Sequence, residues 1–240
     1  MNTSQTADSK PSALQTLVAI VIEPSKAFRD IQSRSMIVFP LLLVILATVL
    51  LWVVYYQMVD FSWLQDKMTA SIPEAAVREK AKEFMTRNFL LISTLIGVVL
   101  VTPGVYATVA VYFMIVSKIK GIAIGFEKWF AFTAWVSVPN LLIVPLGIMQ
   151  IMLSDGGKIS IGQLNPVSLN TMFFHLDDQA RWAGLLNSVS LITVWTCVLS
   201  VIGFQLWSKL SRTTSIVIVL LPYVVIYGIW AAVSFLIKTP

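Results

Sequence analysis

The sequence predicts an all-α fold: a polytopic membrane helix bundle with five transmembrane helices and an N-terminal juxtamembrane amphipathic helix. The 240-residue chain is 57% hydrophobic and has a mean hydropathy of +0.82. Only 12% of its residues are charged, against about 25% in an ordinary soluble domain. Five apolar stretches are each long enough for a helix to cross a hydrocarbon core of ~30 Å.

The first stretch is the clearest membrane span. Apart from Pro40 and Thr48, residues 37–54 are aliphatic or aromatic, with no charge and no amide. A helix in a soluble protein would show a polar face, and this run has none. The five spans are expected at about 36–57, 89–117, 129–153, 183–207 and 214–237.

The remaining segments are interpreted as a tail and as connections around a membrane domain at 36–237. Residues 13–22 are apolar but too short to cross, so we expect them to lie in the interface or against the bundle. The expected connecting segments are a mobile tail at 1–12, interfacial and juxtamembrane helices at 13–35, an outer connection with an amphipathic helix at 58–88, and an outer loop at 154–182.

The stretch before the first span has the pattern of an amphipathic helix. Pro24 suits a first helical turn, since its missing N–H has no helical partner there. Ala27, Phe28 and Ile31 share one face, and the charged residues point elsewhere. We therefore expect its basic side chains at headgroup level. The candidate membrane-interface or partner residues are Lys26, Phe28, Arg29, Ile31 and Arg34.

A second amphipathic helix is predicted in the connection before the second span. Ser71 and Glu74 fit a capping box, in which two side chains satisfy free amides at a helix start. Glu74 with Arg78, and Glu83 with Arg87, are four residues apart in the favourable order. The pattern predicts a helix with a solvated charged face that leads directly into the second span.

Prolines and amides are the notable residues inside the spans. Pro103, Pro139 and Pro222 are candidate kinks, and both static kinks and gating hinges fit the pattern. Asn140 and Asn187 are the expected intramembrane polar groups. Asn140 is expected to bond carbonyls freed by the kink at Pro139, or to line a small polar site.

Pairs of small residues four apart let helix backbones approach closely, and we expect them to support packing within the bundle. These pairs are Gly104 with Thr108, Gly184 with Ser188, and Gly228 with Ala232.

Catalytic chemistry finds no support in the sequence. All 17 basic and 12 acidic residues fall outside the expected spans, which argues against an ion-coupled pump. Cys197 is the single cysteine and His175 the single histidine, so neither a disulfide nor a multi-cysteine metal site is expected. We expect no catalytic residue, no metal, no cofactor and no enzymatic activity. The net charge of +5 is spread over short connections, so nucleic acid is not an expected partner.

The distribution of basic residues predicts a cytoplasmic N-terminus. With that orientation, nine bases and four acids lie inside, and eight of each lie outside. Both short connections, at 118–128 and 209–212, then fall on the inner side, where the positive-inside rule gives them most weight.

Several of these features together resemble the Ypt/Rab-interacting-protein (Yip) family of integral membrane proteins, in its bacterial branch. The similarity rests on residues 23–31 before the first span, the five-span layout, Val138-Pro139, and the segment Leu220–Val224. The resemblance implies no catalytic residues. Eukaryotic members have a long cytosolic N-terminal region and are linked to Rab GTPases and vesicle traffic; here about 35 residues precede the first span, so GTPase binding is not expected.

The resemblance and the uncharged spans together lead to a functional expectation. Some bacterial relatives are associated with ABC-type export systems. We therefore expect a non-enzymatic accessory or scaffold protein of the bacterial inner membrane, bound to lipid and to another membrane protein or a second copy of itself. The alternative is a passive carrier or channel for a small apolar or lipid-like molecule.

Overall fold

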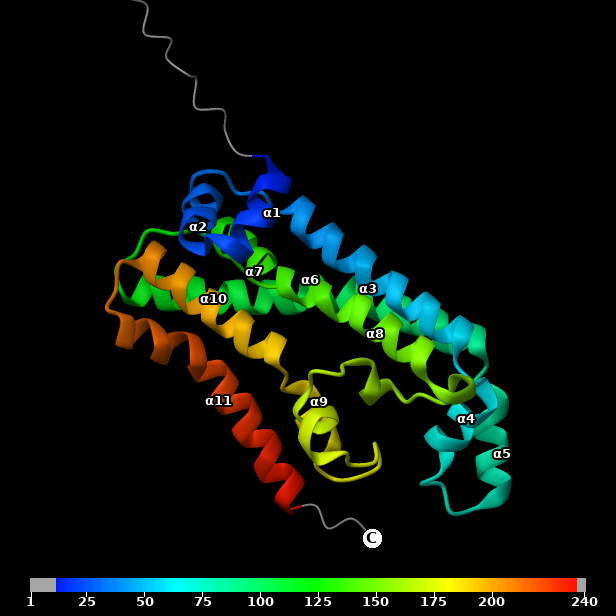
Figure 1. Cartoon of the computed structure of the whole chain (residues 1–240). Helices are drawn as coiled ribbons and strands as arrows, with labels where there is room; N and C mark the ends of the chain where they lie inside the picture. Colours follow the sequence, from blue (N-terminus) through cyan, green and yellow to red (C-terminus); the bar gives the residue numbers. More distant parts are fainter. Residues whose placement is uncertain (1–11, 237–240) are drawn as a thin grey trace, which may run out of the picture.

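The computed structural model describes residues 12–236, and within them the chain is helical and forms no strand (Figure 1). Five helical segments are long and apolar enough to cross a membrane, which confirms the predicted fold class. They are α3 (Val38–Met58), α6 (Arg87–Ile119), α7 with η1 and α8 (Phe126–Val136, Val138–Leu142 and Ile143–Leu153), α10 (Leu191–Ser208) and α11 (Arg212–Leu236).

The shorter helices gather at the two ends of these spans. One end carries α1 (Ala13–Ile22) and α2 (Pro24–Ser33), next to the α6–α7 and α10–α11 connections (Figure 1). The other end carries α4 (Phe61–Thr69), α5 (Ala75–Phe84), η2 (Asp155–Gly157), η3 (Ile161–Leu164), η4 (Asn170–Phe174) and α9 (Ala183–Ser188). Residues 1–11 of the expected tail at 1–12, and the final residue of the fifth expected span, Ile237, lie outside the described residues, whereas Ser12 is the N-cap of α1.

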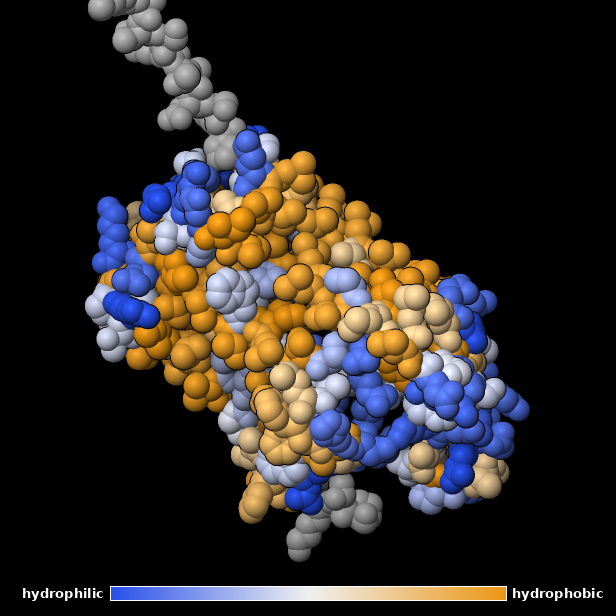
Figure 2. Space-filling model, in the orientation of Figure 1, coloured by the Kyte–Doolittle hydropathy of each residue, from blue (hydrophilic) through white to orange (hydrophobic). Residues whose placement is uncertain are grey.

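Polar residues lie at both ends of the long axis, and an apolar belt lies between them (Figure 2). In the described spans, charged residues occur only in the first or last turns of the helices. A bilayer requires this arrangement, because hydrocarbon cannot solvate an ionised group.

The third span is the centre of the bundle. Nine consecutive residues, 131–139, are buried on every side of the helix. In contrast, within the most apolar 18-residue stretch of α6, only 6% of the residues are buried inside the chain. A helix that is apolar all round packs at the interior, and here α2, α3, α6 and α10 surround it.

Six rings from four helices form an aromatic cluster around the third span. Neighbouring centroids lie 5.1 to 5.5 Å apart, within the range of favourable ring pairs. The members of the aromatic cluster are Phe28 from α2, Phe113 from α6, Trp129 and Phe132 from α7, and Phe204 and Trp207 from α10.

Gly203 lets α10 approach this cluster. A Cβ at this position would lie 2.5 Å from the ring of Phe132 and 2.8 Å from that of Phe28. Two indole N–H groups then fix the N-terminal segment: Trp207 donates to the carbonyl of Phe28, and Trp135 donates to that of Met36, both at 2.8 Å. The juxtamembrane helix is thereby anchored to the third and fourth spans.

The fourth span begins at Leu191, which corrects the expected start at residue 183. The helix is interrupted after Ser188, and Ser190 starts a new one by accepting a hydrogen bond from the N–H of Thr193 at 3.2 Å. Ser190 also forms an isolated β-bridge with Ser168. The apolar composition of this stretch does not reveal such a break, because it depends on a distant segment.

The connection before the second span holds two helices, α4 and α5, and its expected capping box is wrong. Glu74 is the N-cap of α5 but makes no side-chain capping bond. The helix ends at Phe84, and Thr86 caps α6 instead, accepting from the N–H of Phe89 at 3.2 Å. The amphipathic helix therefore does not lead directly into the span.

The two arginines of this connection bind backbone carbonyls instead of the expected glutamates. Arg78 donates to the carbonyl of Ile72 at 2.8 Å, and Arg87 donates to that of Tyr56. Tyr56 lies in the last turn of α3 and Ile72 in the loop between α4 and α5, where backbone carbonyls lack a helical partner and accept more favourably than a solvated carboxylate four residues away.

The packing at Gly203 gives a direct test of the aromatic cluster. Gly203→Ala should lower stability by about 1–3 kcal/mol, because the added methyl group meets two rings that cannot both move. Gly104→Ala is the matched control, since a Cβ there meets nothing within 4 Å; it should be neutral or slightly stabilising. Thermal unfolding in detergent measures both, and equal stabilities would contradict the packing described.

Candidate functional site

The basic side chains of α2 are exposed, whereas its apolar face is buried inside the chain. Lys26, Arg29 and Arg34 face solvent. Phe28 and Ile31 are 0% exposed, packed among residues of α7 and α10. This corrects their expected role at a membrane or partner interface, because a helical pattern identifies an apolar face but not what covers it.

Basic residues dominate the end of the molecule that carries α1 and α2, which we call the basic end. Its one ion pair among the described residues joins Lys26 to Glu23 at 3.8 Å, with both side chains more than half exposed, so it contributes little. The end holds Lys26, Arg29, Arg34, Lys118, Lys120, Lys128, Lys209 and Arg212, against the acids Glu23, Asp30 and Glu127. Such an end suits an anionic membrane surface or an acidic partner.

Helix α1 has one face on the bundle and one face free. Thr16 and Ile20 are fully buried, but Leu14, Val18 and Ile22 are each more than half exposed. The structure thus shows the expected packing against the bundle, and the exposed apolar face is compatible with the boundary between headgroups and acyl chains.

Only one of the three candidate kink prolines interrupts a described helix. Pro139 lies in η1, where the third span changes from α to 3-10 geometry, whereas Pro103 and Pro222 lie within continuous helices. Just before this break, the hydroxyls of Thr133 and Ser137 each donate to the carbonyl four residues back, at 2.9 Å, a contact that often bends helices.

Of the two asparagines, Asn140 lies within the third span as expected, and Asn187 lies outside the fourth. Asn140 is half-buried in η1, and its side chain forms no hydrogen bond within residues 12–236. Asn187 lies in α9, before the fourth span, and packs beside Asp178 and Gly162 at the end opposite the basic end. This corrects its intramembrane assignment, which followed from starting the span too early.

Two of the small-residue pairs face outwards, contrary to the expected packing within the bundle. A Cβ on Gly104 or Gly228 would meet nothing within 4 Å, whereas one on Gly184 would lie 3.2 Å from the ring of Trp230. The pairs on α6 and α11 therefore lie on the free surface of the bundle, and the pair on α9 packs against α11.

The end opposite the basic end, the outer end, is held together by polar contacts between segments distant in sequence. Lys67 of α4 pairs with Asp177, and the side chain of Gln179 donates to the carbonyl of Lys67 at 3.2 Å. The N–H of Asp60 donates to the carbonyl of Gly157 at 2.9 Å. These contacts join α4 to the 154–182 loop.

Ion pairs at the outer end shift two pKa values. The hydrogen bond from Lys67, with that from the N–H of Gln179, holds the pKa of Asp177 below its usual 3.8. Hydrogen bonds to Asp66 and Glu79 raise the pKa of Lys82 above its usual range. Both shifts favour the charged form, so Asp177 and Lys82 are ionised at neutral pH.

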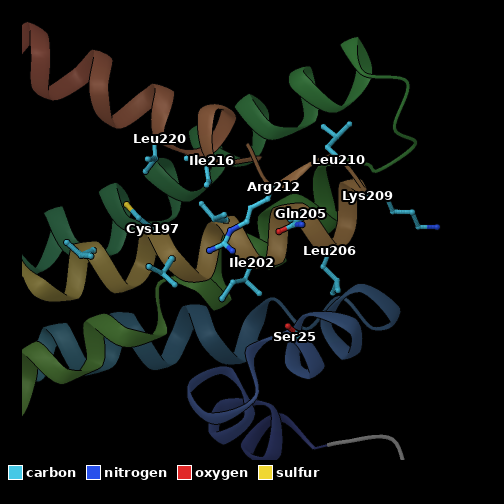
Figure 3. A pocket seen from close by; sticks show the side chains of 13 residues that line it. Ser25, Cys197, Ile202, Gln205, Leu206, Lys209, Leu210, Arg212, Ile216 and Leu220 are labelled. Atoms are coloured by element: carbon cyan, nitrogen blue, oxygen red, sulfur yellow. The ribbon is translucent and has the colours of Figure 1, made fainter. Parts of the chain in front are cut away.

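An open groove of about 990 Å³ runs between α10 and α11 and reaches the basic end (Figure 3). Its walls are largely apolar, and its polar lining is Ser25, Gln205, Lys209 and Arg212, with Cys197 further along the wall. Sequence reasoning missed this site, because its existence depends on how far two helices separate. The available signal was the pair of bases in the short connection between those helices.

The described residues contain no group of three or more His, Cys, Asp or Glu side chains that could hold a metal ion. The charged side chains of the described residues lie at the two ends of the molecule and at the mouth of the groove.

These features define a class first: a polytopic helical membrane protein with an apolar belt, a basic end and two short N-terminal helices packed at that end. A family model, the Yip1 domain, matches residues 18–233, so the chain belongs to the Yip1 domain family. The match extends from α1 into α11 and includes the interfacial helices. No curated protein and no solved structure matches the chain.

The Lys67–Asp177 pair predicts a pH-dependent outer end. Because the pKa of Asp177 is lowered by folding, its contribution is present at neutral pH and is lost as the pH falls below 3.8. Asp177→Asn should make amide exchange in the 154–182 loop a few-fold faster at pH 7, because the variant lacks the carboxylate that pairs with Lys67. Asp155→Asn is the control, since Asp155 has no ion pair among the described side chains. Identical exchange in both variants would contradict the assigned contact.

Proposed function

We propose that this protein is a non-enzymatic accessory or scaffold protein for another membrane complex. The observation that carries the proposal is the free intramembrane surface of two spans. In the most apolar 18-residue stretch of α6 only 6% of the residues are buried inside the chain, and in the corresponding stretch of α11 only 11% are. The outward-facing Gly104 and Gly228 would let a partner helix approach these spans closely.

The basic end supports a more specific version of the proposal. We infer an ABC-type export system as the partner class, in a bacterial cytoplasmic membrane, with the N-terminus in the cytoplasm. The bases of the two short connections, at 118–128 and 209–212, lie at the end with α1 and α2, and the positive-inside rule gives bases in short connections the most weight. The resemblance of residues 23–31 to the bacterial members of the family supports the partner class. Because α2 is anchored by Trp207, it presents Lys26 and Arg29 on a fixed surface.

A second candidate function is passive movement of a small apolar or lipid-like molecule. The groove between α10 and α11 favours it, and the break at Pro139 supplies a flexible point in the third span. A carrier of this kind would work without a stoichiometric protein partner.

Crosslinking in native membranes followed by mass spectrometry separates the two functions. The scaffold proposal expects a stoichiometric partner, another membrane protein or a second copy, with crosslinks to α2, α6 or α11. Charge reversal of the α2 surface, by Lys26→Glu, Arg29→Glu and Arg34→Glu together, should lower recovery of the partner at least about tenfold, as expected when several charged contacts are lost.

The matched control reverses the same number of charges at the same end, by Lys118→Glu, Lys120→Glu and Lys128→Glu. This control should keep the partner, because its bases lie around the end of α6 and the start of α7 and not on α2. Equal loss in both variants would assign the effect to altered membrane orientation. Recovery of the protein alone, at wild-type abundance, would reject the scaffold and support the carrier.

A further inference from the structure

The groove between α10 and α11 has the length of one leaflet of a bilayer. Its lining on α10 runs from Val194 to Lys209. Over that distance a helix rises about 22 Å at ~1.5 Å per residue. One leaflet contributes ~15 Å of hydrocarbon and ~5–8 Å of headgroup region, so the groove matches a single lipid from chain end to headgroup.

The polar and apolar parts of the groove are arranged as in a glycerophospholipid. The part towards the middle of the membrane is lined by residues such as Val194, Val198 and Leu220, together with Cys197. The part at the basic end is lined by Gln205, Lys209 and Arg212, with Ser25 contributed by α2. No acidic residue lines the groove, so its mouth favours a negative charge.

Arg212 is the side chain best placed to bind such a charge. It extends back over the groove beside Gln205, whereas Lys209 points away from it along the end of the bundle (Figure 3). Arg212 has no ion-pair partner within the described part of the chain. A guanidinium binds phosphate oxygens in a two-pronged geometry, and at the edge of hydrocarbon such a bond is weakly screened by water.

We propose that this groove is a binding site for one anionic glycerophospholipid from the leaflet at the basic end. Its acyl chains lie along α10 and α11, and its phosphate is bound by Arg212 with Gln205 and Ser25. Such a lipid fills the space between the fourth and fifth spans, and it links the orientation of α11 to the anionic lipid content of the membrane. The proposal goes beyond the scaffold function and does not depend on it, because it concerns the isolated chain.

Native mass spectrometry of the full chain, released from nanodiscs, tests the site. The discs contain phosphatidylglycerol and phosphatidylcholine in equal amounts with identical acyl chains. The wild-type chain should retain one phosphatidylglycerol in preference to phosphatidylcholine. Arg212→Gln should lower retention of phosphatidylglycerol about tenfold, which is the expected effect of losing one charged hydrogen bond. It should also reduce the preference, because the choline of phosphatidylcholine offsets its phosphate charge and that lipid therefore gains less from Arg212 in the wild-type chain.

Two further variants make the result decisive. Val198→Trp fills the apolar part of the groove and should abolish retention of either lipid, with unfolding temperature showing that the bundle remains folded. Lys118→Gln removes a base at the same end, outside the groove, and should retain phosphatidylglycerol as the wild type does.

Three outcomes would overturn the proposal. The first is equal retention of the two lipids by the wild-type chain. The second is an unchanged preference in Arg212→Gln. The third is a lipid-free dimer that Val198→Trp disrupts, since this would assign the groove to a second copy of the chain.

Discussion

Hydrocarbon as a solvent is the constraint on which the rest of this structure depends. It solvates neither charges nor unpaired backbone groups, so the chain crosses it as helices whose charged residues lie only in their terminal turns. Charged side chains and their ion pairs are therefore found at the two ends of the molecule. At the outer end, ion pairs such as Lys67–Asp177 join the connecting segments to one another. At the basic end, most of the basic side chains lack an ion-pair partner among the described residues. They are therefore available to bind lipid or protein.

Inside the bilayer, helices gain little by hiding apolar surface from lipid, so shape decides which of them pack together. The third span is held by interlocking rings, and Gly203 provides the space that Phe28 and Phe132 occupy. The indole of Trp207 adds a hydrogen bond to the backbone of α2. This packing links the core to function, because it fixes the basic surface of α2 to the membrane bundle. In contrast, α6 and α11 have broad free faces, where partners or lipids can bind.

Hydropathy was sufficient to predict the fold class, the number of spans and the apolar face of α2. It failed where the outcome depended on contacts between distant segments. The start of the fourth span is set by Ser190, which bridges Ser168, and the early start assumed from composition moved Asn187 wrongly into the membrane. Likewise, periodicity showed that Phe28 belongs to an apolar face but not that α7 and α10 cover it. The groove at Arg212 depends on the separation of two helices, which no local pattern encodes.

Five membrane crossings separate the basic end of the molecule from its outer end. Single-cysteine variants in a Cys197→Ser background test it most directly, using a membrane-impermeant thiol reagent on sealed membranes of known orientation. Cysteines placed at Lys26 and Lys118 should react from one side of the membrane, and those placed at Lys80 and Lys158 should react from the other. Labelling of two positions from the same end on opposite sides of the membrane would contradict the account.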